Sequence, residues 1–365
     1  MENIFKIPFY ARAALVSIST FALVFTFYEG REIIVPIVFA IILSILLNPL
    51  VNYLNSKRIP KIISISITVL LTTLVILVAF YFISIQLSHL SESYPQLKEK
   101  FDKTSLELVH WTSNTFNIRQ WKINEWTKET QSNAINDFEI KENLTEIGRV
   151  LMMFVLFPVY LFMILYYKPL LLEFIHKLFN AEHHNTVASI LASTEQIIQT
   201  YIIGLVFEMI IMTVLHSIGL LLIGIEYAII LGIIGAVLNI IPYIGGIIAT
   251  ALPMTVAFVT KDSLIYPMLV LLLFIVIQVI DNNFIIPRIV SSRVKINALV
   301  SVIVVLIGGA LWGVSGMFLS IPLTAILKVI FDHVEPLKPW GFLLGNTIPM
   351  KAKLKRVIPH GQDAS

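Results

Sequence analysis

Long stretches without a charged side chain constrain this sequence more than any other feature. Residues 13–28, 33–56 and 62–89 contain no Asp, Glu, Lys or Arg, and only short charged links separate them. A helix needs about 20 apolar residues to cross the roughly 30 Å hydrocarbon core of a bilayer. We therefore predict that residues 1–90 form three membrane-spanning helices, which would act as a scaffold.

Further apolar stretches follow in the rest of the chain. Residues 150–167 predict a fourth span, residues 202–225 a fifth that is interrupted only by Glu208 and His216, and residues 267–280 a sixth. The composition agrees, because 57% of the residues are hydrophobic and only 13% are charged. That leaves too little polar surface for a soluble protein of this length. The sequence therefore predicts an all-α polytopic membrane protein.

Polar segments divide these spans into parts. Residues 91–149 contain acids, lysines and three tryptophans without a long apolar stretch, so we expect a small extracytoplasmic helical cap there. The predicted domains are residues 1–90 for spans one to three, 91–149 for the cap, 150–199 for span four with a cytoplasmic linker, 200–335 for a transport unit with two hairpins, and 336–365 for a cytoplasmic tail.

Two stretches have an unusual length. Residues 227–260 and 296–327 are uncharged for 34 and 32 residues, which is too long for one untilted helix and too short for two spans. Each has a glycine cluster near its middle. We expect re-entrant helical hairpins that turn at these glycines, because irregular backbone at membrane depth must be buried in protein or face water. The alternative is a long tilted helix kinked at a proline. The predicted fold is about six full transmembrane helices plus two re-entrant hairpins, or eight transmembrane segments by hydropathy.

Orientation follows from lysine and arginine, which are enriched in cytoplasmic loops. If the two long stretches are hairpins, the basic residues of the short loops all lie on one side. These residues are Lys6, Arg12, Lys57, Arg58, Lys61, Arg288, Arg293 and Lys295. We therefore expect both the N- and C-termini to be cytoplasmic and the cap to be outside. The hairpins would then enter from opposite faces, as they do in several secondary transporters with a midplane site.

Several classes of function are excluded by what the sequence lacks. There is no cysteine, so there is no disulfide framework and no Cys-based metal site. We find no H-E-x-x-H motif, no G-x-x-x-x-G-K-[ST] loop and no dinucleotide fingerprint. The net charge of +3 does not indicate nucleic-acid binding. We therefore predict that the protein is not an enzyme and that it has no cofactor, no metal and no nucleic-acid partner.

The C-terminal half carries specific motifs. Residues 224–246 read G-I-E-Y-A-I-I-L-G-I-I-G-A-V-L-N-I-I-P-Y-I-G-G, residues 278–287 read Q-V-I-D-N-N-F-I-I-P, and residues 308–316 read G-G-A-L-W-G-V-S-G. These motifs resemble the signature of the AI-2E (autoinducer-2 exporter) family, and the resemblance extends over nearly the whole chain. The sequence departs from the family pattern at Leu205, where a glutamine is expected, and at Asp281, where a glutamate is more usual.

The resemblance implies a multi-pass protein of the bacterial cell inner membrane, assembled as a homo-oligomer and specifically a pentamer, that moves a solute by an elevator-type motion. It implies export of an autoinducer-2-like signal, with Na⁺(Li⁺)/H⁺ antiport as the alternative. The expected partners are a small polar solute or a monovalent cation or proton, together with membrane lipid. A second alternative is a non-transporting membrane scaffold or receptor.

The candidate substrate- or ion-binding residues are carboxylates, amides and glycines near the predicted membrane midplane. They are Glu208, Asn239, Pro242, Gly245, Gly246, Gln278, Asp281, Asn282, Asn283, Gly313 and Gly316. Inserting a carboxylate into a membrane span costs about 2.5–3.5 kcal/mol on insertion scales. Such a residue therefore indicates a transport pathway or an interaction with another polar side chain. The structural alternatives stay open: Glu208 would hydrogen-bond a neighbouring helix, Asp281 would pair with Arg288 or Arg293, and the glycines would only allow close packing.

Overall fold

The computed structural model describes residues 8–116, 144–241, 244–261, 263–289 and 296–346 of the chain. Helices make up the named secondary structure of this part, apart from an isolated bridge between Ile296 and Gly345. Seven of these helices are long and apolar enough to cross a membrane. This confirms the prediction of an all-helical, polytopic membrane protein.

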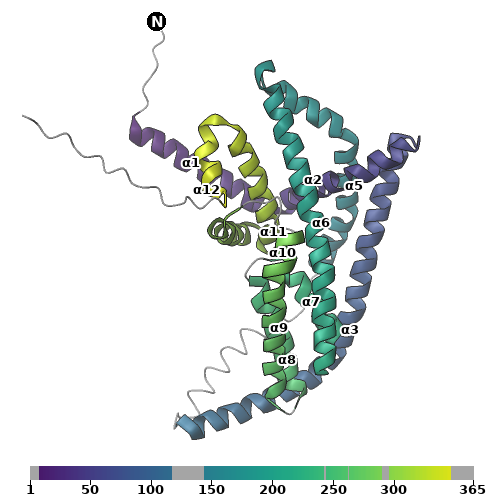
Figure 1. The fold of residues 1–365 in the computed structure, drawn as a ribbon, viewed down its shortest axis with the longest axis vertical. Helices are drawn as coiled ribbons and strands as arrows, with labels where there is room; N and C mark the ends of the chain where they lie inside the picture. Colours follow the sequence, from purple (N-terminus) through teal and green to yellow (C-terminus); the bar gives the residue numbers. More distant parts are fainter. Residues whose placement is uncertain (1–7, 117–143, 242–243, 262, 290–295, 347–365) are drawn as a thin grey trace, which may run out of the picture.

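Four long helices form the first half of the described chain (Figure 1): α1 (Phe9–Glu29), α2 (Arg31–Ser56), α3 (Lys61–Phe116) and α5 (Leu144–Leu178). Side chains from α2, α3 and α5, including Val51, Ile65 and Leu161, pack into one buried cluster. The apolar part of α3 that could cross a membrane is Lys61–Ile85, close to the predicted third span, and the helix continues from there into the polar segment as far as Phe116. Residues 117–143, in the middle of the expected cap, lie outside the described residues, so the cap stays a prediction.

The second half begins with a short 3₁₀ turn and contains the remaining helices. In order they are η1 (Ala181–His183), α6 (His184–Ile223), α7 (Ala228–Asn239), α8 (Ile244–Thr260), α9 (Ile265–Ile280), η2 (Asp281–Ile285), α10 (Ile286–Ile289), α11 (Ala298–His333), η3 (Glu335–Leu337) and α12 (Lys338–Leu344). Helices α6 and α9 contact each other and run side by side along the long axis of the molecule (Figure 1). Together with α7 and α8 they enclose the buried side chains of Leu220, Leu231, Ala257 and Val270.

The first long apolar stretch is two helices and not one. Helix α7 ends at Asn239, and α8 begins five residues later at Ile244. A Cβ atom on Gly245 would collide with the carbonyl oxygen of Leu238, so the start of α8 lies directly against the end of α7. The chain therefore reverses here, and glycine is required for the close approach.

The second long apolar stretch also turns. Within α11 the backbone leaves helical geometry at Trp312 and Gly313, where Gly313 has φ +62° and ψ −142°. A Cβ atom on Gly308 would strike the carbonyl oxygen of Gly316, although the two residues would lie about 12 Å apart in a straight helix. The two arms of α11 therefore fold back on one another. Entry of either stretch into the membrane from one side stays a prediction.

The outer surface of the described chain is strongly apolar. Helix α1 has no buried residue, and large side chains such as Phe9, Phe21 and Leu222 are mostly exposed. Apolar surface on this scale is typical of protein that meets lipid or another subunit. A few polar groups are nevertheless buried, among them Glu208 and Asp281, and these two belong to the site described next.

Candidate functional site

A pocket of about 860 Å³ lies among α6, α7, α8, α9, η2, α10 and α11, next to the reversal between α7 and α8. Most of its walls are apolar, with Phe274 and Met254 among the larger side chains. Its polar lining residues are Tyr201, Glu208, Asn239, Thr250, Gln278, Asp281, Asn282 and Ser301. Polar groups that converge in an otherwise apolar pocket are typical of a binding site.

Asp281 is the most completely buried of these groups, with 0% of its side chain surface exposed. Its Oδ2 accepts a hydrogen bond from Nδ2 of Asn239 over 3.1 Å. Its Oδ1 has no hydrogen-bond partner in the described part of the chain. A buried acceptor without a partner is costly, so this oxygen is available for a proton, a cation or a donor group of a solute.

Glu208 brings a second carboxylate to the same pocket. It lies in α6 and is 6% exposed. The described residues that line the pocket include no Lys, Arg or His, so no basic side chain there neutralises Glu208 or Asp281. Two buried carboxylates without a basic partner repel an anion and favour a cation, a proton or hydrogen-bond donors.

The backbone around Asp281 has an uncommon geometry. The five residues of η2 form a single π-helical turn between α9 and α10. Such turns are rare and are found mostly at functional sites, because the extra residue redirects the side chains beside it. Gln278 donates from Nε2 to Oδ1 of Asn282 over 3.4 Å, and both residues line the pocket.

The structure brings together Glu208, Asn239, Gly246, Gln278, Asp281 and Asn282 from the sequence-based candidates. Gly245 is buried against α7 and supports the reversal without lining the pocket. Asn283 is exposed and donates to the carbonyl oxygen of Val279 over 2.8 Å. Pro242 lies outside the described residues.

The glycines of α11 lie elsewhere. Gly313 and Gly316 are not among the residues that line the pocket. At the turn of α11, Nε1 of Trp312 donates to the carbonyl oxygen of Phe27 over 2.8 Å, and the two rings lie 6.0 Å apart. The second turn therefore contacts the end of α1, whereas the first turn contributes directly to the pocket.

Sequence reasoning missed three polar residues of the pocket: Tyr201, Thr250 and Ser301. A signal was available for Tyr201, because it precedes Leu205 and Glu208 by four and seven residues and so shares a helical stripe with them. Thr250 and Ser301 lie on other helices, and no pattern within one helix would have placed them here. His216, which stands out in the same helix as Glu208, stacks on Phe274 with ring centroids 4.4 Å apart.

Known proteins resemble this chain over most of its length. A sequence model of the AI-2E family transporter matches residues 15–335. The "Putative transport protein YrrI" of Bacillus subtilis (strain 168) is 26% identical over 83% of this chain and 87% of its own length. The "AI-2 transport protein TqsA" of Escherichia coli (strain K12) is 24% identical over 83% of this chain and 86% of its own length.

Proposed function

The chain belongs to the AI-2E transporter family, and from that premise we propose that it exports a small, donor-rich polar solute through the pocket beside α7 and α8. It is a multi-pass membrane transporter, and the proposal concerns its cargo and its mechanism. The observation that carries the proposal is Oδ1 of Asp281, which has no hydrogen-bond partner among the described residues and lies in a pocket whose described lining includes two carboxylates and no Lys, Arg or His.

The chemistry of the pocket favours one class of cargo. Hydroxyl groups can donate to Asp281 and Glu208, and Asn239 and Gln278 can both donate and accept. The apolar walls accommodate a carbon skeleton, whereas a phosphate or carboxylate group would face two carboxylates. A neutral polyhydroxylated signal such as autoinducer-2 fits this description, and a relative carries that cargo in its name.

The two reversals suit a transport unit. Under this proposal α7 with α8, and the two arms of α11, are re-entrant hairpins that enter from opposite faces of a bacterial inner membrane. Residues 200–335 move as an elevator against the scaffold of α1, α2, α3 and α5, within a homo-oligomer that the family resemblance makes a pentamer. Both chain termini are cytoplasmic, in accordance with the basic residues of the short loops.

The test is release of autoinducer-2 from proteoliposomes that contain the purified protein. Asp281→Asn and Glu208→Gln remove one carboxylate each and should lower the initial rate about tenfold or more, since a hydrogen bond to a charged group contributes about 1.5–3 kcal/mol. Glu173→Gln, on an exposed face of α5, is the matched control and should keep the parent rate.

Three outcomes separate the alternatives. Loss of release in the pocket variants alone supports the proposal. Equal release in the Glu173 and pocket variants removes the pocket from the pathway. A sodium- or lithium-dependent change in internal pH without solute release would replace solute export with cation–proton exchange.

A further inference from the structure

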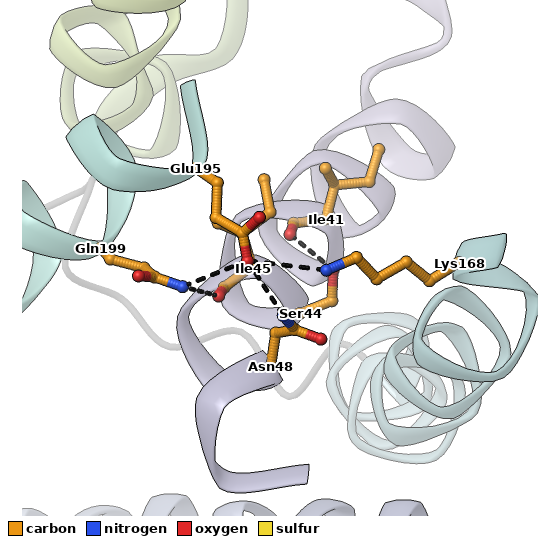
Figure 2. Close-up of polar contacts among 7 residues, drawn as sticks. All are labelled: Ile41, Ser44, Ile45, Asn48, Lys168, Glu195 and Gln199. Carbon is orange, nitrogen blue, oxygen red and sulfur yellow. Dashed lines mark hydrogen bonds and ion pairs between the residues drawn. The ribbon is translucent and has the colours of Figure 1, made fainter. Parts of the chain in front are cut away.

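A polar junction joins α2, α5 and α6 (Figure 2). Oε1 of Glu195 accepts from Nδ2 of Asn48 over 2.9 Å and from Nε2 of Gln199 over 3.4 Å. The same oxygen lies 3.5 Å from Nζ of Lys168. One carboxylate of α6 thus contacts both neighbouring helices.

Gln199 makes a second contact that depends on a proline. Its Nε2 donates to the backbone carbonyl oxygen of Ile45 in α2 over 2.9 Å. In a regular helix that carbonyl would accept from the backbone of residue 49, but residue 49 is Pro49, which has no N–H. Gln199 therefore supplies from another helix the donor that α2 lacks. Figure 2 shows the amide pointing at this carbonyl from one side while Glu195 reaches Asn48 and Lys168.

This contact fixes α6 in a way that the surrounding packing cannot. Apart from this bond and the one from Asn48 to Glu195, α2 and α6 pack through apolar side chains that include Ile42, Ile198 and Ile202. Apolar burial is not directional, so these side chains would tolerate a small slide or rotation of α6. A hydrogen bond to one particular carbonyl specifies both distance and angle.

The two faces of α6 have different tasks. Gln199 and Glu195 are one turn apart and face α2 and α5. Glu208 follows Gln199 by nine residues, which is about 2.5 turns, so it lies on roughly the opposite face and about 14 Å further along the helix. Leu205 and Tyr201 share the pocket face with Glu208. Rotation of α6 at the junction would therefore turn these side chains relative to the pocket.

We propose that Gln199, supported by Glu195, is a positioning residue. It sets the register of α6 against α2 at the point where Pro49 removes a backbone donor, and thereby sets how Leu205 and Glu208 face the pocket. Gln199 takes no part in solute contact, since it does not line the pocket. Its importance depends on Pro49: if α2 regained its own donor at residue 49, the carbonyl of Ile45 would be satisfied without Gln199. The measurement of autoinducer-2 release rests on the proposed function, whereas the measurement of thiol labelling does not.

The experiment is a double-mutant cycle read by thiol labelling. The chain has no cysteine, so Leu205→Cys introduces a single thiol on the pocket face of α6. Its reaction rate with a small methanethiosulfonate reagent is measured in proteoliposomes for the parent, Gln199→Leu, Pro49→Ala and the double variant. Gln196→Leu, at an exposed position three residues away, is the matched control.

Gln199→Leu should change the labelling rate about threefold to tenfold, the factor that corresponds to one typical net hydrogen bond. Pro49→Ala gives the carbonyl of Ile45 a donor within α2 and should change the rate in the same direction as Gln199→Leu. The double variant should change the rate no more than the larger single change, and Gln196→Leu should leave it unchanged. Gln199→Glu, which replaces the donor by an acceptor, should shift the rate in the same direction as Gln199→Leu and serves if the leucine variant does not fold.

Two results would overturn the inference. One is an unchanged labelling rate in both Gln199 variants. The other is a double variant whose change is the full product of the two single changes, which would mean that Gln199 and Pro49 act independently. Release of autoinducer-2, measured on matched samples without the labelling cysteine, should fall in Gln199→Leu and by a similar factor in the double variant. If the parent protein releases no autoinducer-2, the proposed cargo fails while the labelling cycle still decides the role of Gln199.

Discussion

Asn239 at the end of α7 donates a hydrogen bond to Asp281 in the π turn after α9, with 3.1 Å between Nδ2 and Oδ2. The bond connects the tip of the α7–α8 reversal to the neighbouring helix at the edge of the pocket. It also orients the carboxylate, so that one oxygen is held by Asn239 and the other is left without a partner in the described residues.

The first prediction concerns this pair. Asn239→Leu removes the donor and leaves both oxygens of Asp281 unpaired, so solute affinity should fall about tenfold to hundredfold, in line with about 1.5–3 kcal/mol for a hydrogen bond to a charged group. Asn239→Asp places a third carboxylate in the pocket and should be at least as harmful. Concentration-dependent transport in proteoliposomes measures the effect. Equal transport by the parent and the leucine variant would remove Asn239 from the site.

The second prediction compares two adjacent glycines. A Cβ atom on Gly246 would lie 3.1 Å from Oε1 of Gln278, which is a movable side chain, whereas a Cβ atom on Gly245 would meet the backbone oxygen of Leu238. Gly245→Ala should therefore destabilise the protein by about 1–3 kcal/mol, while Gly246→Ala should mainly weaken solute binding. Thermal unfolding of the purified protein and the apparent KM for transport separate the two effects. Equal melting temperatures for both variants would contradict the close packing of α8 on α7.

The third prediction tests the reversal inside α11. Met317 contacts the position that a Cβ atom on Gly309 would occupy, whereas residues eight apart in a straight helix are separated by about 12 Å. Gly309→Cys combined with Met317→Cys should therefore form a disulfide on mild oxidation, because a disulfide requires Cα atoms within about 7 Å. The cysteine-free parent gives a clean background for detection by thiol counting. Failure of this pair to cross-link would mean that α11 is not folded back.

The fourth prediction concerns backbone conformation. Gly313 has φ +62° with ψ −142°, a region that is almost exclusive to glycine, whereas Gly224 has φ +78° with ψ +30° at the end of α6. Gly313→Ala should lower stability by about 1–3 kcal/mol. Gly224→Asn should be tolerated, because asparagine readily adopts the left-handed helical region. Thermal unfolding of the two variants side by side provides the measurement, and a stable Gly313 variant would mean that the turn is not as described.

The spans could be predicted from the sequence because each one leaves a local signature. Residues 33–56 and 267–280 are uncharged over about the thickness of a bilayer, and α2 and α9 match them closely. The reversal at Gly245 was also foreseeable, since a stretch of 34 uncharged residues with glycine at its middle has few other solutions. Glu208 and Asp281 stood out for the same local reason, as carboxylates within apolar helices.

Relations between helices could not be read from the sequence in this way. Gly313 and Gly316 resemble Gly245 and Gly246 in their local context, yet the turn of α11 contacts Phe27 instead of the pocket. That position depends on how α11 packs against α1, which no periodicity within α11 encodes. The hydrogen bond from Gln199 to the carbonyl oxygen of Ile45 likewise forms only because α2 and α6 pack together in one particular register.

The two-faced character of α6 has a consequence for saturation mutagenesis of this gene segment. Because buried side chains such as Leu205 and Glu208 lie on one side of the helix and exposed ones such as Phe207 and Ile210 on the other, tolerance to substitution should oscillate along the codons of α6 once per turn of 3.6 residues. Sequence drift in this helix would be confined to its exposed side, so that α6 would evolve more slowly than α1, which has no buried residue.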